Sequence, residues 1–484
     1  MIVRRRAAAM GVTVAGCALL LTATACGGPA DDDRGGADRR PAPRADKAAA
    51  VPLLPVPRGD GDRGAARGDD FNGDGLRDLV LDDLVHDSHG DDAGIGVVYG
   101  APRGPKSGAE GGAEGGAEGG AEGGAEGGAK DGAKSSAKGS AQNGRAVDVR
   151  TRQLLSPAKQ AAPTKGELPA AFDSAARCDL DKDGFTDLVV ATDPPYNGIG
   201  RPPVPLQILF GSPAGLTGKA VKLAIPAGAR DGNEWPDQPV CGDFDGDGAQ
   251  DLVVHASNAQ VSFLRGPFTE RGAPRSGKVL KAPGTVPRGP AVDVNRDGYD
   301  DLLVRAGGGT SRSSLVLGGP AGPTRTAVVL PAGQGLAFGR FDGGAALDAA
   351  IATKTGIALR YDVPGTRRAT LDAPAGPALT VESGDFDGDG RSELVVGGRE
   401  LTVHEGRREG LARSASTTLS PAAKGTSEVI TAGDFDGDGM DDLVVRTHKG
   451  ETEDEVALYR GTRTGLARSP ELTFSTSAFV TGTR

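Results

Sequence analysis

One short pattern occurs seven times in the sequence and constrains the fold more than any other feature. Most copies have Asp, Asn or Glu at positions 1, 3, 5 and 9, Gly at position 6, and an apolar run after position 9. The copies begin at Asp70, Asp179, Asp243, Asp293, Arg340, Asp385 and Asp434. The last four intervals between these starts, 50, 47, 45 and 49 residues, are nearly equal. A repeat at this period predicts one supersecondary unit per copy.

The pattern has the chemistry of a calcium-binding loop. Calcium prefers six to eight oxygen ligands, and a tight turn at Gly brings alternate acidic side chains inward. Without a cation, carboxylates this close would repel by roughly a few kcal/mol per pair. Position 12 is apolar in every copy and the exits are Leu-Val-Val or similar, which predicts strands and excludes an EF-hand. Seven acidic turns without metal remain the alternative.

A second element follows most loops after about 20 to 30 residues. It consists of an apolar strand, a Gly, a few turn residues, a second Gly and another strand, as near Tyr99, Phe210, Leu317, His404 and Tyr459. This order is typical of a β-hairpin. Each copy therefore contains a strand before the loop, a strand after it and two hairpin strands. Four short strands per copy predict an all-β, seven-bladed β-propeller.

The repeats resemble the FG-GAP and VCBS repeats of integrin α subunits and of bacterial surface proteins. Phe338-Gly339 retains the Phe-Gly pair, and the GDFDGDG core begins at Gly242, Gly384 and Gly433. The resemblance covers residues 63–484. It implies calcium loops on one face of the propeller and partner binding by loops on the other.

By that resemblance, six copies have a complete set of calcium ligands. These are Asp70, Asn72, Asp74 and Asp78; Asp179, Asp181, Asp183 and Asp187; Asp243, Asp245, Asp247 and Asp251; Asp293, Asn295, Asp297 and Asp301; Asp385, Asp387, Asp389 and Glu393; and Asp434, Asp436, Asp438 and Asp442. We therefore expect about six bound Ca²⁺ ions.

The fifth copy departs from the family pattern between Arg340 and Asp348. Arg340 replaces the first acid and Gly344 the third, which leaves Asp342 and Asp348. We expect no metal in this loop. Arg340 is expected to pair with Asp342 or Asp348 and to hold the loop without an ion.

The N-terminal segment is typical of an exported protein. Residues 1–25 combine three arginines with an apolar run and small residues, which predicts a signal peptide. Cys26 follows directly and resembles the lipidated Cys of bacterial lipoproteins; plain secretion is the alternative. Residues 26–62 are predicted to form a flexible tether, and residues 106–143 a low-complexity insert in the first blade. Cys178 and Cys241 can form a disulfide in an oxidising compartment or remain two buried thiols.

The composition gives little support to catalysis or nucleic-acid binding. Acidic residues number 65 against 55 basic residues, a net charge of −10, and the five His are scattered without metal-ligand spacing. We expect a non-enzymatic monomer that binds an unknown extracellular protein or glycan. It is expected to bind no nucleic acid and to be attached to a membrane only through a lipid anchor. One alternative is a lectin-like polysaccharide-binding module, in which Trp235, the single Trp of the chain, would contact the sugar. The other is a calcium-dependent polysaccharide lyase or hydrolase.

Ring closure is predicted from the two ends of the repeat region. TSEVITAG precedes the last loop and TSAFVTG ends the chain, as though another repeat began there. We expect Ala478 to Thr481 to dock as a strand in the first blade.

Overall fold

The computed structural model describes residues 68–84, 94–100, 147–230, 235–307, 311–372, 379–449 and 454–479. Contacts divide the chain into two units, residues 1–50 and 51–484, and the described residues all lie in the second. The predicted signal peptide (1–25), Cys26, the tether (26–62) and the insert (about 106–143) lie outside these ranges. In the described ranges, no helix has the length and hydrophobicity needed to cross a membrane.

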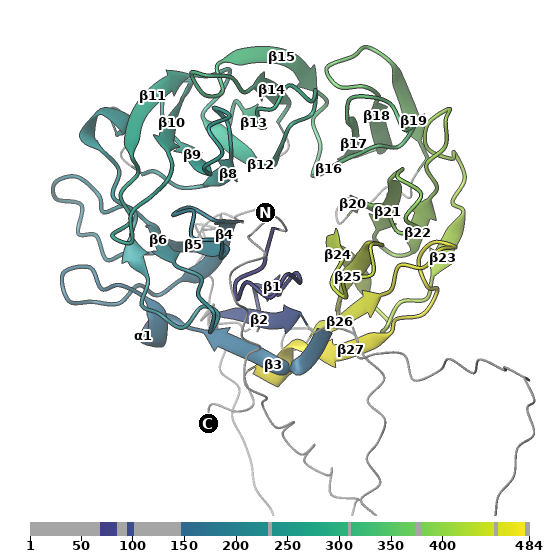
Figure 1. Cartoon of the computed structure of the whole chain (residues 1–484), viewed down its shortest axis with the longest axis horizontal. Coiled ribbons are helices and arrows are strands. Elements are labelled where there is room, and N and C mark those ends of the chain that lie inside the picture. Colours follow the sequence, from purple (N-terminus) through teal and green to yellow (C-terminus); the bar gives the residue numbers. More distant parts are fainter. Residues whose placement is uncertain are drawn as a thin grey trace, which may run out of the picture. The chain divides into compact units, whose positions relative to one another are not determined.

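The described residues form seven antiparallel sheets, six of four strands and one of three, arranged as the blades of a β-propeller (Figure 1). Along the chain, the strands are β1 (Leu79–Leu81), β2 (Ile95–Gly100) and β3 (Val147–Leu155) in blade 1; β4 (Phe172–Cys178), β5 (Asp187–Thr192), β6 (Leu206–Leu209) and β7 (Val221–Lys222) in blade 2; β8 (Val240–Gly242), β9 (Asp251–His255), β10 (Gln260–Arg265) and β11 (Ser276–Lys281) in blade 3; and β12 (Val286–Val292), β13 (Asp301–Arg305), β14 (Ser313–Leu317) and β15 (Arg325–Leu330) in blade 4.

Blades 5 to 7 have the same order. They contain β16 (Gly335–Gly339), β17 (Asp348–Thr353), β18 (Gly356–Arg360) and β19 (Arg368–Leu371); β20 (Thr380–Gly384), β21 (Glu393–Gly397), β22 (Leu401–His404) and β23 (Thr417–Leu419); and β24 (Thr426–Gly433), β25 (Asp442–His448), β26 (Asp454–Tyr459) and β27 (Leu472–Ser475). Three short helices complete the described structure: α1 (Pro157–Gln160) and the 3₁₀ helices η1 (Ala227–Ala229) and η2 (Thr476–Phe479). The predicted seven-bladed propeller is confirmed.

Burial on both faces explains why the strand after each loop is an uninterrupted apolar run. In β9, Leu252 and Val254 belong to the core shared with blade 2, whereas Val253 belongs to the core shared with blade 4. All three side chains are fully buried. Successive residues of a strand point to opposite faces, so a blade between two others needs apolar residues at every position.

Neighbouring blades are also joined by a reciprocal pair of hydrogen bonds, which we call the inter-blade clasp. Thr186 N donates to Asp70 O (2.8 Å), and Asp70 N donates to Thr186 Oγ1 (3.1 Å). The same two bonds join Asp300 to Asp243, Ser392 to Arg340, and Asp441 to Asp385. In every clasp, position 8 of one loop holds position 1 of the preceding loop. The clasp therefore links the loops of adjacent blades directly.

The ring closes differently from the sequence-based expectation. Residues 476–479 form η2 rather than a strand, and Ala478 O accepts a hydrogen bond from Arg152 Nε of β3 (3.0 Å). The prediction of a strand at Ala478 to Thr481 is therefore wrong for the described residues 478 and 479. The chain leaves β27 at the outer edge of blade 7, where the neighbouring elements are the outer strands of blade 1. It enters that space as a turn.

Apolar packing and one arginine complete the junction between blades 7 and 1. Phe479 is 5% exposed and lies in a core that contains Leu79 of blade 1 and Phe435 of blade 7. Arg77 occupies the clasp position of blade 1, but its Nη1 donates to Ala432 O (2.9 Å) and its Nη2 pairs with Asp69 (3.0 Å). Each of the other six blades has a first strand before its loop. Blade 1 has no such strand among the described residues.

A disulfide joins blades 2 and 3. Cys178, the last residue of β4, is bonded to Cys241 in β8, with a Cα–Cα distance of 6.3 Å. The two cysteines therefore form a disulfide and are not two buried thiols.

Candidate metal centres

All the loops between the first and second strands of the blades lie at one edge of the ring. Strands within each sheet are sequential and antiparallel, so every connection from a first to a second strand returns at the same edge. In blade 2, the loop begins after Cys178 and ends at Asp187, two residues that face each other across β4 and β5. The ladder thus brings position 1 and position 9 of each loop together.

The carboxylate at position 1 folds the loop around itself. Asp179 Oδ1 accepts from Asp183 N (3.1 Å), and Oδ2 accepts from Gly184 N (3.0 Å). The corresponding carboxylates of the other loops with an acid at position 1 accept from the amide of position 6 in the same way: Asp70, Asp243, Asp293, Asp385 and Asp434. Position 1 is therefore an anchor of the turn as well as a candidate ligand.

Two positions of the turn adopt left-handed backbone conformations. Gly184 at position 6 has φ of 93°, as expected from its glycine, but position 4 is also left-handed, with φ of 65° at Lys182 and 61° at Arg296. Five loops have glycine at position 4. Only the glycine at position 6 was predicted to permit the turn, although the recurrence of glycine at position 4 is a visible signal for this second left-handed residue.

Positions 3 and 5 form consecutive side-chain turns that point their oxygens to the same side. Asp181 Oδ1 accepts from Asp183 N (3.2 Å), and Asp183 Oδ1 accepts from Phe185 N (3.0 Å). In the loops with Asn at position 3, the amide also donates to position 5: Asn72 to Asp74 and Asn295 to Asp297, both at 3.0 Å. The structure thus brings positions 3 and 5 of blades 1 and 4 together as well.

The acid at position 9 has a structural role that the sequence analysis missed. Asp187 Oδ2 accepts from Leu180 N (2.8 Å) inside the loop, and Oδ1 accepts from Gly211 N (2.9 Å) at the hairpin. It was predicted only as a ligand that closes the shell. Each carboxylate oxygen has two lone pairs, so these hydrogen bonds leave capacity for a cation.

Burial places these inner carboxylates in an unfavourable environment for negative charge. Desolvation raises the pKa of Asp187 to about 8, and it raises the pKa of Glu393 and of Asp442 to about 8, with further contributions from the other loop acids. A bound cation would compensate this cost.

The acids converge closely enough to share one ion in several blades. Carboxylate oxygens lie within 4.8 Å of one another in three sets with the same positions: Asp179, Asp181 and Asp187; Asp243, Asp245 and Asp251; and Asp385, Asp387 and Glu393. Blade 7 has a set of Asp434, Asp436 and Asp438. Among the described residues, Asp251 Oδ2 and Asp385 Oδ1 are buried and have no hydrogen-bond partner. Unsatisfied buried oxygens and an all-oxygen donor set fit a hard cation such as calcium.

The fifth loop is organised differently from the sequence-based expectation. Asp362, from the hairpin, joins Asp342 and Asp348 within 4.8 Å, so this loop has three acids rather than two. Arg340 forms none of the ion pairs found among the described residues; instead, Arg367 pairs with Asp342 and lies over the Tyr361 ring at 4.0 Å. The predicted arginine was therefore the wrong one. Arg367 precedes β19 and approaches the loop only in three dimensions.

Comparison with known families agrees with this architecture. A model of the FG-GAP-like repeat matches residues 179–254 and 385–445, which include the complete loops of blades 2, 3, 6 and 7. The propeller contains FG-GAP-like repeats in these two regions. No curated protein matches the sequence of the propeller.

Three solved structures show weak similarity to the FG-GAP-like propeller. A lectin from Agrocybe aegerita that recognises non-reducing terminal N-acetylglucosamine has a TM-score of 0.40 and 15% identity, over 59% of this chain and 73% of that chain. A mutant of AofleA from Arthrobotrys oligospora has a TM-score of 0.35 and 12% identity, over 63% and 86%. The V. cholerae biofilm matrix protein Bap1 has a TM-score of 0.27 and 16% identity, over 63% of this chain and 39% of that chain.

Proposed function

We propose that this FG-GAP-like propeller is an exported, non-enzymatic binding protein that calcium stabilises. The convergence of buried acids in the loops supports calcium binding, because these carboxylates have too few positive partners for their burial. The disulfide supports export, since disulfides persist in oxidising compartments. Cys26 would then either carry a lipid anchor at the cell surface or belong to a secreted chain.

The face opposite the calcium loops is the proposed partner-binding surface. Connections from second to third strands and between successive blades reach this opposite edge. Three of the four exposed large hydrophobic side chains in the described ranges lie in such connections next to blade 2: Leu168, Tyr196 and Ile199, at 46%, 38% and 77% exposure. Exposed apolar side chains that recur on one face are typical of binding surfaces. This grouping is the observation that carries the proposal.

The alternative enzymatic functions receive less support from the geometry. A hollow beside blade 2 is lined by Asp179, Lys182 and Asp183 from the loop, and by Arg177. Both of its carboxylates already belong to the proposed calcium ligands, and Arg177 pairs with Asp69 at 3.0 Å. The hollow therefore provides no separate acid pair for hydrolysis.

Calcium removal is expected to lower the melting temperature of the propeller by more than about 10 °C. An ion present at a hundred times its dissociation constant stabilises the folded state by about 2.7 kcal/mol, and several loops contribute. Differential scanning calorimetry with excess EGTA measures the change. Added calcium should restore the transition, whereas the same concentration of magnesium should not. An unchanged transition in EGTA would refute the calcium assignment.

Partner binding is expected to depend on the loop between β5 and β6. We expect the Tyr196→Ala/Ile199→Ser variant to lose at least about tenfold in affinity, because it removes the exposed apolar contacts. Pull-downs on immobilised cell-wall polysaccharides and on extracellular proteins separate a glycan partner from a protein partner. Val329→Ser, which changes an equally apolar exposed residue on the outer strand β15, is the matched control. Equal retention of both variants would place the binding surface elsewhere.

A further inference from the structure

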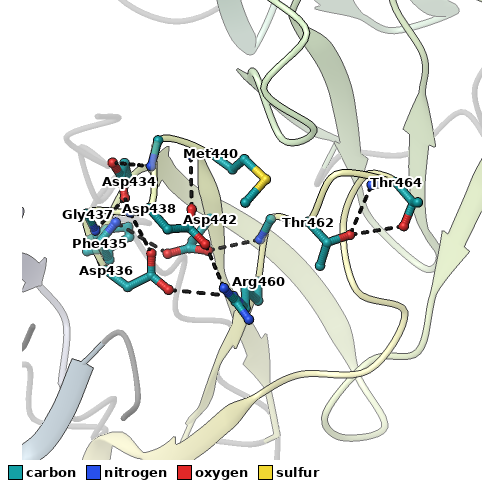
Figure 2. A network of polar contacts seen from close by, with 12 residues as sticks. Asp434, Phe435, Asp436, Gly437, Asp438, Met440, Asp442, Arg460, Thr462 and Thr464 are labelled. Carbon is teal, nitrogen blue, oxygen red and sulfur yellow. Dashed lines mark hydrogen bonds and ion pairs between the residues drawn. The ribbon is translucent and has the colours of Figure 1, made fainter. Parts of the chain in front are cut away.

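An arginine reaches into the loop from the hairpin in blades 3 and 7. Arg460 directly follows β26; its Nε lies 3.6 Å from Asp436 Oδ2 and its Nη2 lies 2.6 Å from Asp438 Oδ2 (Figure 2). In blade 3, Arg265 is the last residue of β10 and contacts Asp245 through Nε. The guanidinium groups thus occupy the same place in the two loops.

These contacts use the oxygens that a cation would need. Asp436 and Asp438 hold positions 3 and 5 of the loop, and the side chain of Asp436 is fully buried. Asp245, at position 3 of its loop, is also fully buried, and Arg265 Nη2 lies 3.5 Å from Asp247 at position 5. A guanidinium that bridges two carboxylates satisfies them with charge-assisted hydrogen bonds.

The loops of blades 2, 4 and 6 lack this arginine in the described structure. The residue at the corresponding place, immediately before the hairpin glycine, is Phe210, Leu317 or Glu405. In blade 6, Arg391 pairs with Asp389 at 2.7 Å, but this carboxylate is 43% exposed and lies at position 5 only. The half-buried Asp387, at position 3 of blade 6, forms none of the ion pairs found among the described residues and lies within 4.8 Å of Asp385 and Glu393.

Blade 3 differs from the other loops in the hydrogen bonds at position 3. In blades 2, 6 and 7, the position 3 oxygen accepts from the position 5 amide, at 3.2 Å for Asp181, 3.0 Å for Asp387 and 3.1 Å for Asp436. Asp245 Oδ1 has no hydrogen-bond partner in the described structure, and its other oxygen faces Arg265. A second arginine, Arg275, pairs with Asp247. Guanidinium groups therefore engage the carboxylates of Asp245 and Asp247, although Asp245 stays within 4.8 Å of Asp243 and Asp251.

We propose that Arg265 and Arg460 compete with calcium, so that the loops of blades 3 and 7 bind calcium more weakly than those of blades 2, 4 and 6. The proposal rests on the calcium binding proposed above. Calcium must displace the guanidinium from positions 3 and 5 before it can use them as ligands. Loss of one or two hydrogen bonds to charged groups corresponds to about ten- to a hundredfold in affinity. The same arginines hold the two loops closed when calcium is scarce.

Calcium titration of the mature chain by isothermal calorimetry tests the proposal. The wild type should show two affinity classes. Arg460→Gln should convert one weak site into a tight one, with at least about tenfold higher affinity. Arg391→Gln, which removes an arginine from the exposed carboxylate of blade 6, should leave the number of tight sites unchanged.

A second pair of variants decides the question if Arg460→Gln fails to fold. Asp181→Asn in blade 2 should remove one tight site, whereas Asp436→Asn in blade 7 should remove none. Both substitutions retain the side-chain oxygen that accepts from the position 5 amide. The proposal is overturned if both Asp→Asn variants lose a tight calcium site. It is also overturned if folded Arg460→Gln has the same number of tight sites as the wild type. Either result leaves the calcium function intact. A chain that binds no calcium overturns both.

Discussion

Phe479→Ala is expected to destabilise the propeller by about 3–5 kcal/mol. The side chain is 5% exposed and packs between blades 7 and 1, where truncation leaves a cavity. Its ring also lies beside Phe474, with 6.5 Å between the ring centroids. Because this core joins the two ends of the ring, the loss should affect the global unfolding transition. Urea denaturation in saturating calcium measures the change.

Two further variants show whether the effect comes from this junction. A methyl group on Gly96 would lie 2.8 Å from the Phe479 ring, so Gly96→Ala should also destabilise the chain. Thr473→Ala, an exposed position on the adjacent strand β27, should change stability by less than about 0.5 kcal/mol. If Phe479→Ala unfolds at the same urea concentration as Thr473→Ala, η2 does not close the ring.

Removal of the disulfide by Cys178→Ala/Cys241→Ala is expected to cost about 2–4 kcal/mol. The bond closes a chain segment with a separation of 63 residues, which contains most of blade 2, and it restricts the unfolded chain accordingly. Thermal denaturation with and without reductant measures the effect. Reductant should lower the wild-type transition to that of the double variant.

The double variant is also the control for this experiment, because reductant should leave its transition unchanged. If the wild type melts above the double variant and still does not respond to reductant, the reagent does not reach the disulfide. Equal stability of the wild type and the variant without reductant would contradict the expected contribution.

The sequence was sufficient to predict the blades because their determinants are local. The loop pattern, the apolar exit and the hairpin glycines recur within each period, and each signal specifies a strand or a turn by itself. Within a loop, positions 1, 3, 5 and 9 converge because alternate residues of a tight turn share one side. Even so, the role of Asp187 as an anchor of the hairpin depends on Gly211, which lies in the next turn of the blade.

The features that could not be predicted all involve contacts between distant segments. Arg460 follows its loop carboxylates by more than 20 residues, and nothing in the spacing distinguishes it from a solvent-exposed arginine. Arg367 and Asp362 reach the fifth loop in the same way. At the end of the chain, TSAF resembles the start of another repeat, but its conformation is decided by the space beside β2 and β3.

The direction of the inter-blade clasp has a consequence for synthesis on the ribosome. In four pairs of successive blades, position 8 of the later blade holds position 1 of the earlier one, as Asp441 holds Asp385. Because the N-terminal blades emerge first, a clasped loop acquires its last hydrogen bonds only after the next blade has been translated. The nascent chain therefore completes these four loops one blade behind the growing end. No blade is translated after blade 7. Arg77 of blade 1 is translated early, but its hydrogen bond to Ala432 O can form only after blade 7 has been synthesised.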